Sequence, residues 1–232
     1  MDDRTFERAG AVAAVGVAVL SLVYALAYLV ITPSAQRASD VDGYYRSYLA
    51  HPTGARIAST CLAVSGLLVG LAVVAFARRV SAGAPAAAAI SWATILGVLG
   101  GFATAAHGLG ALLGEDELAR RYASGDPAIQ AAVRVAHAGP SQVDPRGLAT
   151  FLAAGLVALV LGVAASRLVP RLGTLGIVLG ADMVVLFLAT AVGVGPLVLV
   201  TGGLASVVLG PIWWVWVARL LWAGPAPQVT GT

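Results

Sequence analysis

Six long apolar runs alternate with short polar segments along the 232 residues of the chain. None of them shows the strict apolar–polar alternation over about ten residues that is typical of membrane-barrel strands. An α-helix needs ~20 residues to cross a hydrocarbon layer of ~30 Å, and each run is long enough. The pattern therefore predicts an all-α fold, an integral membrane bundle of six transmembrane helices, near residues 11–31, 55–77, 86–113, 147–166, 172–194 and 196–222.

Helix-ending residues separate these runs. Thr32-Pro33-Ser34 ends the first, since proline lacks an N–H donor and restricts the residue before it. Arg78-Arg79 closes the second, Leu168-Val169-Pro170 separates the fourth from the fifth, and Val194-Gly195-Pro196 separates the last two. We expect residues 1–232 to form a single polytopic membrane domain.

The first loop on the far side from the N-terminus carries Tyr44, Tyr45 and Tyr48. Tyrosines gather at membrane interfaces, so this segment predicts an aromatic belt on a short surface helix. The second such loop, residues 114–146, contains two short helical patterns, the second beginning at Asp126-Pro127. That second pattern is amphipathic, so it could lie on the bilayer or cover the bundle.

Composition supports a lipid environment. Hydrophobic residues make up 59% of the chain and charged residues 11%, whereas soluble domains carry roughly 25% charged residues. The formal charge of +3 is too small to favour nucleic acid as a partner. All fourteen basic residues are arginine, which excludes lysine Schiff-base chemistry and, with abundant alanine and glycine, indicates a GC-rich bacterial genome. We therefore expect a bacterial plasma membrane.

The arginines also predict an orientation. Seven would lie on each side of the membrane, so their number decides nothing. The positive-inside rule works best over short loops, and both short basic turns, Arg78-Arg79 and Arg167 to Arg171, lie on the N-terminal side. This pattern predicts that both termini are cytoplasmic.

Small residues four positions apart predict where helices touch, because membrane helices associate through close backbone approach. Four of the six runs carry such pairs, namely Gly66/Gly70, Gly97/Gly101, Gly176/Gly180 and Gly202/Ser206/Gly210. Gly210-Pro211 should also kink the last helix.

Asp182 is the first candidate for chemistry, because it lies about ten residues into the fifth apolar run. An aspartate near the bilayer midplane costs roughly 2.5–3.5 kcal/mol to insert, so we expect it to face the bundle interior and to have a partner. It could relay protons, bind a cation or act as a general acid. The alternative is a hydrogen-bonded clasp between helices.

His107 is the second catalytic candidate, in the outer half of the third run. It could share a proton with a carboxylate or simply bond a hydroxyl or backbone group. Four residues are candidates for lining a cavity: Thr104 on the face of His107, Glu115 at the outer mouth, and Trp213 and Trp214 in the last run. Glu115 could instead be solvated, and the tryptophans could instead face lipid.

Cofactor sites are not apparent. His51 and His137 fall in loops, which disfavours a haem held by two histidines, and Cys61 is the only cysteine. The chain has no phosphate loop and no dinucleotide fingerprint. We expect no cofactor and no metal site.

The segment Leu168-Val169-Pro170-Arg171-Leu172-Gly173-Thr174-Leu175-Gly176, with Gly180 after it, resembles a bacterial six-helix membrane family called domain of unknown function 4386. That family has a Pro-Arg turn after its fourth helix. The segments His51–Ile57 and Asp144–Leu148 add to the similarity, which would cover most of the chain. The resemblance implies six helices but no activity and no functional residue, and this chain departs from it at Asp182 and in its tryptophan-rich last helix.

Three functions remain open. The first is a carrier or proton-coupled sensor for a hydrophobic small molecule or an ion, working through Asp182. The second is an integral membrane enzyme for a lipid or isoprenoid substrate, with Asp182 and His107 as acid and base. The third is an accessory subunit. The lipid bilayer is the expected partner in all three, and the oligomeric state stays undetermined.

Overall fold

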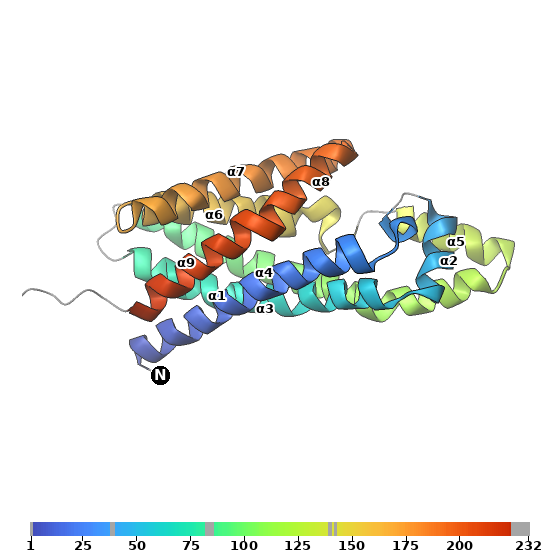
Figure 1. Ribbon diagram of the computed structural model, residues 1–232, viewed down its shortest axis with the longest axis horizontal. Helices are drawn as coiled ribbons and strands as arrows, with labels where there is room; N and C mark the ends of the chain where they lie inside the picture. Colours follow the sequence, from blue (N-terminus) through green and yellow to red (C-terminus); the bar gives the residue numbers. More distant parts are fainter. Residues whose placement is uncertain (1, 38–39, 82–85, 139–140, 142, 224–232) are drawn as a thin grey trace, which may run out of the picture.

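Helices dominate the computed structural model, which describes residues 2–37, 40–81, 86–138, 141 and 143–223 (Figure 1). Within these residues it is an all-α bundle, and six helices are long and apolar enough to cross a membrane. Their bounds are Asp3–Ile31, Thr53–Ser81, Ala87–Ala123, Pro145–Ala165, Pro170–Val192 and Gly195–Ala223. The predicted six-helix fold is confirmed.

Three of the spans are single α-helices and three contain a wider π-helical stretch. The single ones are α3 (Thr53–Ser81), α4 (Ala87–Ala123) and α7 (Pro170–Val192). The others are α1 (Asp3–Leu26) with η1 (Ala27–Ile31), η3 and η4 (Pro145–Gly147, Leu148–Ala153) with α6 (Ala154–Ala165), and α8 (Gly195–Gly203) with η5 (Leu204–Leu209) and α9 (Gly210–Ala223). Outside the spans lie η2 (Ser34–Arg37), α2 (Val41–Ala50) and α5 (Pro127–Ala138).

The ends of the spans follow local chemistry. The Asp2 side chain caps α1 by accepting a hydrogen bond from the Thr5 N–H at 2.7 Å. Pro170 begins α7, and Gly193 ends it with a φ of 78°, a conformation that glycine adopts without strain. Pro196 then lies in the first turn of α8, so α7 and α8 form a tight antiparallel pair.

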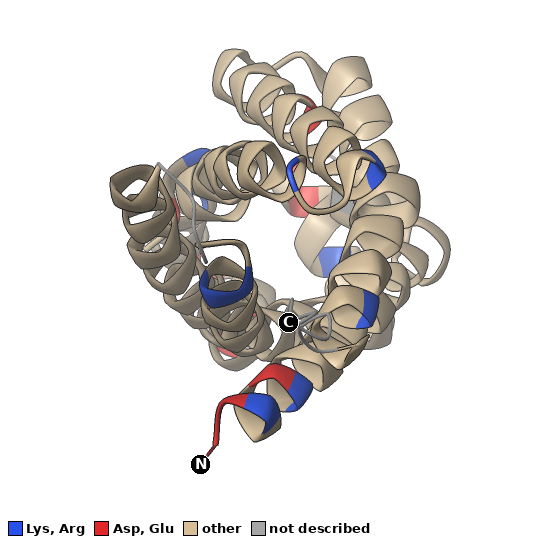
Figure 2. Ribbon diagram, turned by 90° about the vertical axis from the view of Figure 1, so that its left-hand side faces the viewer, with Lys and Arg blue, Asp and Glu red and all other residues tan. Residues whose placement is uncertain are grey.

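The spans form a ring when viewed along the bundle (Figure 2). Helix α3 packs between α1 and α4, and α6 packs against both α4 and α7. Helices α1 and α9 lie side by side, with the start of α1 and the end of α9 at the same end of the bundle (Figure 1). Towards the other end, α1 and α8 diverge.

Close backbone approach holds these helices together. A Cβ atom on Gly66 would lie 2.5 Å from the Gly101 carbonyl oxygen, and one on Gly180 would lie 2.6 Å from the Gly155 carbonyl oxygen. These distances leave no room for a side chain, so α3–α4 and α6–α7 are true glycine interfaces. Gly70, by contrast, has nothing within 4 Å of its Cβ position. Its backbone nitrogen nevertheless lies 3.4 Å from the Cβ position of Gly101, so both members of the predicted pair Gly66/Gly70 lie at the α3–α4 interface, and only at Gly66 would a side chain collide.

The Gly210-Pro211 step produces a widened turn. The Gly210 N–H bonds the Ala205 carbonyl five residues earlier, and Pro211 has no N–H to donate. The hydrogen-bond ladder is thus re-formed as the π-helical segment η5, one of the recognised consequences of proline inside a helix.

A second, smaller unit projects from the end of the bundle opposite the N-terminus, and we call it the cap: α2, α5 and the last part of α4. Helix α4 was predicted to end near residue 113 but continues to Ala123, and its 37 residues span about 55 Å, well beyond a hydrocarbon layer. Residues such as Glu117, Leu118 and Ala119 favour helix, so nothing stops α4 at the membrane surface.

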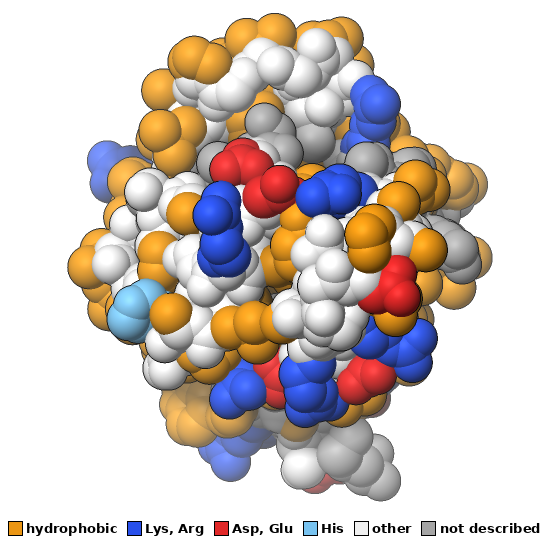
Figure 3. All heavy atoms as spheres, turned by 90° about the vertical axis from the view of Figure 1, so that its right-hand side faces the viewer, with side chains coloured by type: hydrophobic (Ala, Val, Ile, Leu, Met, Phe, Trp, Pro, Cys, Tyr) orange, Lys and Arg blue, Asp and Glu red, His pale blue; other side chains and the backbone are white. Residues whose placement is uncertain are grey.

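The cap has its own small core, formed by Tyr45, Tyr48, Ala119, Tyr122 and Val133. Tyr45 and Tyr48 are 0% and 2% exposed, so the predicted aromatic belt is wrong for these two side chains. Charged side chains gather on the outside of this end of the molecule (Figure 3). The cap is therefore built like a water-facing miniature domain.

Candidate ligand cavity

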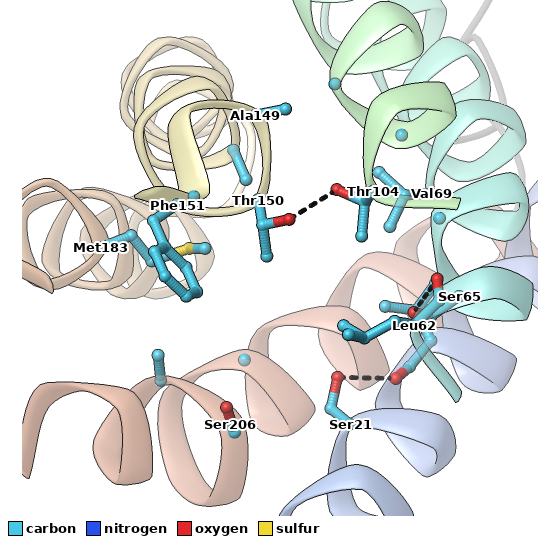
Figure 4. A pocket seen from close by; sticks show the side chains of 18 of the residues that line it. Ser21, Leu62, Ser65, Val69, Thr104, Ala149, Thr150, Phe151, Met183 and Ser206 are labelled. Atoms are coloured by element: carbon cyan, nitrogen blue, oxygen red, sulfur yellow. Dashed lines mark hydrogen bonds between the residues drawn. The ribbon is translucent and has the colours of Figure 1, made fainter. Parts of the chain in front are cut away.

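A cavity of about 510 Å³ lies inside the ring, and residues from all six spans line it (Figure 4). Small-molecule sites usually measure about 300–1,000 Å³ and are mostly apolar with a few polar groups. This cavity has that composition, with its apolar and polar parts at opposite ends.

The end of the cavity farther from the cap is apolar. Trp213 and Trp214 form its aromatic wall, with ring centroids 4.7 Å apart, and the Phe76 ring meets Trp213 edge-on. Trp213 is only 2% exposed and fits against α7 because Gly176 there has no side chain. Its indole nitrogen has no hydrogen-bond partner among the described residues and faces this notch.

At the polar end of the cavity, nearer the cap, Asp144 binds the start of the fourth span and is itself only 4% exposed. Its carboxylate accepts hydrogen bonds from the Ala149 N–H at 2.6 Å, from the Thr150 N–H at 3.2 Å and from the Thr150 hydroxyl. The Thr150 and Thr104 hydroxyls are 3.0 Å apart, which links the fourth span to the third (Figure 4). Asp144 thus caps the fourth span and fixes one wall of the cavity.

His107 joins the same group from α4. Its Nδ1 lies 3.1 Å from the Ser141 hydroxyl, and that hydroxyl oxygen accepts the Asp144 N–H at 3.1 Å. If the Ser141 hydroxyl donates its own proton to Nδ1, Ser141 donates one hydrogen bond to His107 and accepts one from the Asp144 N–H. That assignment leaves the Nε2–H of His107 as a donor, since a neutral imidazole carries one proton.

Arg146 lies at the cavity mouth with an unusual backbone. Its φ is 55° and that of Gly147 is 77°, so two consecutive residues are left-handed, a strained conformation for arginine. Its guanidinium donates to the Ala191 carbonyl near the C-terminal end of α7, where the helix dipole favours a cation. The side chain therefore ties the fourth span to the fifth beside the cavity.

Two of the π-helical segments contribute directly to the cavity wall. Ala149, Thr150 and Phe151 come from η4, and Ala205 and Ser206 come from η5. Single π-helical turns inside α-helices occur frequently at functional sites.

The structure brings four of the six sequence candidates to this cavity and not the other two. Thr104, His107, Trp213 and Trp214 are among the residues that line it. Asp182 and Glu115 are not.

The two candidate carboxylates outside the cavity, Asp182 and Glu115, are half-buried, and each has one oxygen without a hydrogen-bond partner in the described part of the chain. Asp182 lies on α7 between Val178 and Val185, which are 48% and 41% exposed. Glu115 lies at the base of the cap, close to the Tyr44 hydroxyl, whose pKa is raised by burial and by this carboxylate.

Sequence reasoning missed Ser141, Asp144, Arg146 and Thr150 as site residues. They lie at and just after the end of a polar loop, where charged residues are usually solvated. The signal that could have identified them is Asp144-Pro145-Arg146-Gly147, in which an acidic residue precedes a proline at the start of a span. Among the described residues, no group of three or more metal-ligating side chains could hold an ion.

The fold and the cavity define a multi-pass α-helical membrane protein with an internal cavity. Comparison of the chain with protein-family models, curated proteins and solved structures gives no match.

Proposed function

We propose that this protein is a carrier that binds a small, largely apolar molecule between its six helices. The observation that carries the proposal is the 510 Å³ cavity, whose walls come from every span. Tight glycine interfaces show that this chain can close helices onto one another, so an open volume of this size inside the same bundle favours a ligand-binding role.

The position of the cavity favours entry from the bilayer. Ser21 and Tyr24 of α1 line it on one side and Leu186 and Thr190 of α7 on the other, whereas no described residue of α8 does. Helix α1 packs against α9 but not comparably against α8, from which it diverges towards the cap (Figure 1), so a molecule already dissolved in lipid would enter between α1 and α8 in this proposal.

The carrier proposal rests on this cavity and no longer on Asp182. That residue, half-buried on α7, remains a candidate proton or cation site, or a clasp. The carboxylate placed to serve the cavity is Asp144, although its hydrogen bonds to the start of the fourth span already engage both of its oxygens.

The proposal includes the orientation and the membrane. Arg78 at the end of α3 bonds Asp3 at the start of α1 at 2.6 Å, so this basic turn lies at the N-terminal end. With the positive-inside rule this supports cytoplasmic termini in a bacterial plasma membrane. A cysteine replacing Thr5 in a Cys61→Ala background should react with an impermeant thiol reagent only after permeabilisation, and one replacing Ala131 in intact cells. The reverse pattern would overturn the orientation.

A second candidate, a membrane enzyme acting on a lipid or isoprenoid, is favoured by one observation. His107 lies in the cavity wall and connects through Ser141 to the Asp144 backbone, so a titratable ring is held beside the apolar volume. In this version Asp182 has no direct role, because it does not line the cavity.

Photo-crosslinking tests the binding site. A long-chain alcohol carrying a diazirine would be irradiated with the protein in lipid vesicles, and modified residues mapped by mass spectrometry. We expect adducts around Phe151 and Met183, both in the cavity wall. Gly100→Phe should abolish them by filling the cavity. Gly110→Phe is the matched control, because Gly110 lies on the same helix with open space around it.

Three outcomes separate the candidates. Adducts only at lipid-facing positions, unchanged by Gly100→Phe, would refute an internal site and leave an accessory role. Cavity adducts together with protein-dependent transfer of the unmodified alcohol between vesicle leaflets support the carrier. If a hydrophobic compound extracted with the protein is instead converted during incubation, and His107→Ala stops the conversion, the enzyme is correct.

A further inference from the structure

The polarity of the cavity carries one inference further, which rests on the proposed function. We propose that the ligand is a single-chain amphiphile with an anionic head, held with its head at Arg146 and His107 and its chain directed towards Trp213 and Trp214.

The balance of hydrogen-bond donors and acceptors at the mouth of the cavity indicates the charge of the ligand's head group. Asp144, the carboxylate there, already accepts three hydrogen bonds from the fourth span. Arg146 has five N–H donors, and the described contact with the Ala191 carbonyl uses one of them. The spare capacity at the mouth consists of donors, so it matches a group that only accepts.

His107 adds to this surplus. Ser141 occupies its Nδ1, and no described residue bonds its Nε2. With the Ser141 proton on Nδ1, the Nε2–H is available to the cavity. A carboxylate or a phosphate could accept from both the imidazole and the guanidinium, and hydrogen bonds to charged groups are the stronger kind.

The walls between the two ends support a hydrocarbon body for the ligand. The Ser21 and Ser65 hydroxyls donate to the Val17 and Leu62 carbonyls of their own helices, at 2.9 Å and 3.3 Å (Figure 4). They are therefore satisfied without a ligand. Among the described residues of this wall, the Ser206 and Tyr24 hydroxyls make no such bond, and Met183, Leu179 and the two tryptophans supply apolar surface.

Quenching of tryptophan emission by brominated ligands tests both which head group is bound and which way the ligand lies in the cavity. Trp92, Trp216 and Trp222 would be replaced by phenylalanine so that emission comes from Trp213 and Trp214. In lipid nanodiscs, a C12 fatty acid brominated at the end of its chain should quench this emission strongly. The same acid brominated beside the carboxyl should quench weakly. Equal quenching, or the reverse order, would overturn the orientation while leaving binding intact.

A comparison of head groups tests whether the bound anion belongs to an amphiphile or is free phosphate. The terminally brominated fatty acid and the matching monoalkyl phosphate should both bind at least tenfold more tightly than the methyl ester, and inorganic phosphate alone should not displace them. Equal binding of acid and ester would refute the anionic head. No saturable quenching by any of the three would instead refute the internal site itself.

Matched variants assign the effect to the mouth. Arg146→Gln should reduce the preference for acid over ester several-fold, and Arg120→Gln, which removes an arginine paired with Glu117 on the cap, should leave it unchanged. His107→Phe provides an independent test if Arg146→Gln does not fold, since it removes only the Nε2 donor and the Ser141 bond. A preference that both mouth variants retain would overturn the assignment.

Discussion

Helices pack in opposite ways in the membrane bundle and in the cap. In the bundle, α6 meets α7 where Gly155 and Gly180 let the two backbones touch. In the cap, α2, α4 and α5 meet around buried tyrosines, with ion pairs at the rim. The difference reflects the solvent, because lipid offers no hydrophobic driving force between helices, whereas water does.

Charge behaves differently in the two regions as well. At the cap, Asp42 accepts hydrogen bonds from Arg134 at 3.0 Å and from the Tyr122 hydroxyl, and these contacts hold the pKa of Asp42 below its usual range. Burial and the nearby Asp116 raise the pKa of Tyr48 to about 12, so it stays a neutral donor to that carboxylate. Inside the bundle, Asp182 has no comparable partners among the described residues. Acid and salt should therefore act on the cap first.

The largest effect should come from Gly180→Leu. Its Cβ would lie 2.6 Å from the Gly155 carbonyl and 2.7 Å from the Leu159 backbone nitrogen, and neither can move without separating α6 from α7. We expect destabilisation beyond the ~1–3 kcal/mol typical of overpacking, measured as a lower unfolding temperature in detergent. Gly110→Leu, in open space, should be neutral. An unchanged Gly180→Leu protein would show that this contact does not hold the bundle together.

Tyr45→Ala should have the next largest effect, confined to the cap. Removing a large buried aromatic side chain costs about 3–5 kcal/mol in a well-packed core. Hydrogen exchange in α2 and α5 should accelerate strongly, while amides of α6 and α7 keep their protection. Equal acceleration in both regions would mean that cap and bundle unfold as one unit, and the contrast between them would fail.

Acidification should destabilise the cap in two steps, each with a smaller effect than Tyr45→Ala. Burial lowers the pKa of His137, so its contribution is present above the unfolded value of about 6.5 and is lost as pH falls towards the folded pKa. The contribution of Asp42 is present above about 3.9 and is lost as pH falls through its lowered pKa.

Hydrogen exchange of α5, corrected for intrinsic rates at each pH, measures both steps. His137→Asn should remove the first step and Asp42→Asn the second, and 1 M salt should weaken the second by screening the Arg134 pair. A cap whose protection stays constant from pH 8 to pH 3 would contradict both assignments.

The smallest effect should come from Asp182→Asn. No hydrogen bond of the described residues is lost, and no charge needs to be desolvated, so the change in stability should stay within ~0.5 kcal/mol or be favourable. The unfolding temperature in detergent measures it. A large loss would reveal a partner for this carboxylate, such as a bound cation or a second subunit, and would favour the functional candidates for Asp182.

Sequence patterns predicted the six spans well because hydrophobic length is a local property that a bilayer imposes directly. They predicted Gly101 and Gly180 as contact positions, and also Gly70, whose backbone lies at the α3–α4 interface but whose Cβ position is open, because spacing alone does not say how closely two helices approach at each glycine. They also assigned Tyr45 to a membrane belt, since a tyrosine near a span end looks the same in sequence whether it meets headgroups or a second helix.

The sequence alone determined the solvent of this protein, the number of its membrane spans and most of their ends, through apolar length, proline and paired arginines. Only the tertiary structure decided where the polar groups meet. Thr104, His107, Ser141 and Asp144 come from two spans and the loop before one of them, and their contacts depend on how α4 faces the fourth span. Such long-range pairing leaves no periodic signal, whereas a carboxylate inside an apolar run is conspicuous in sequence even when, like Asp182, it lies outside the cavity.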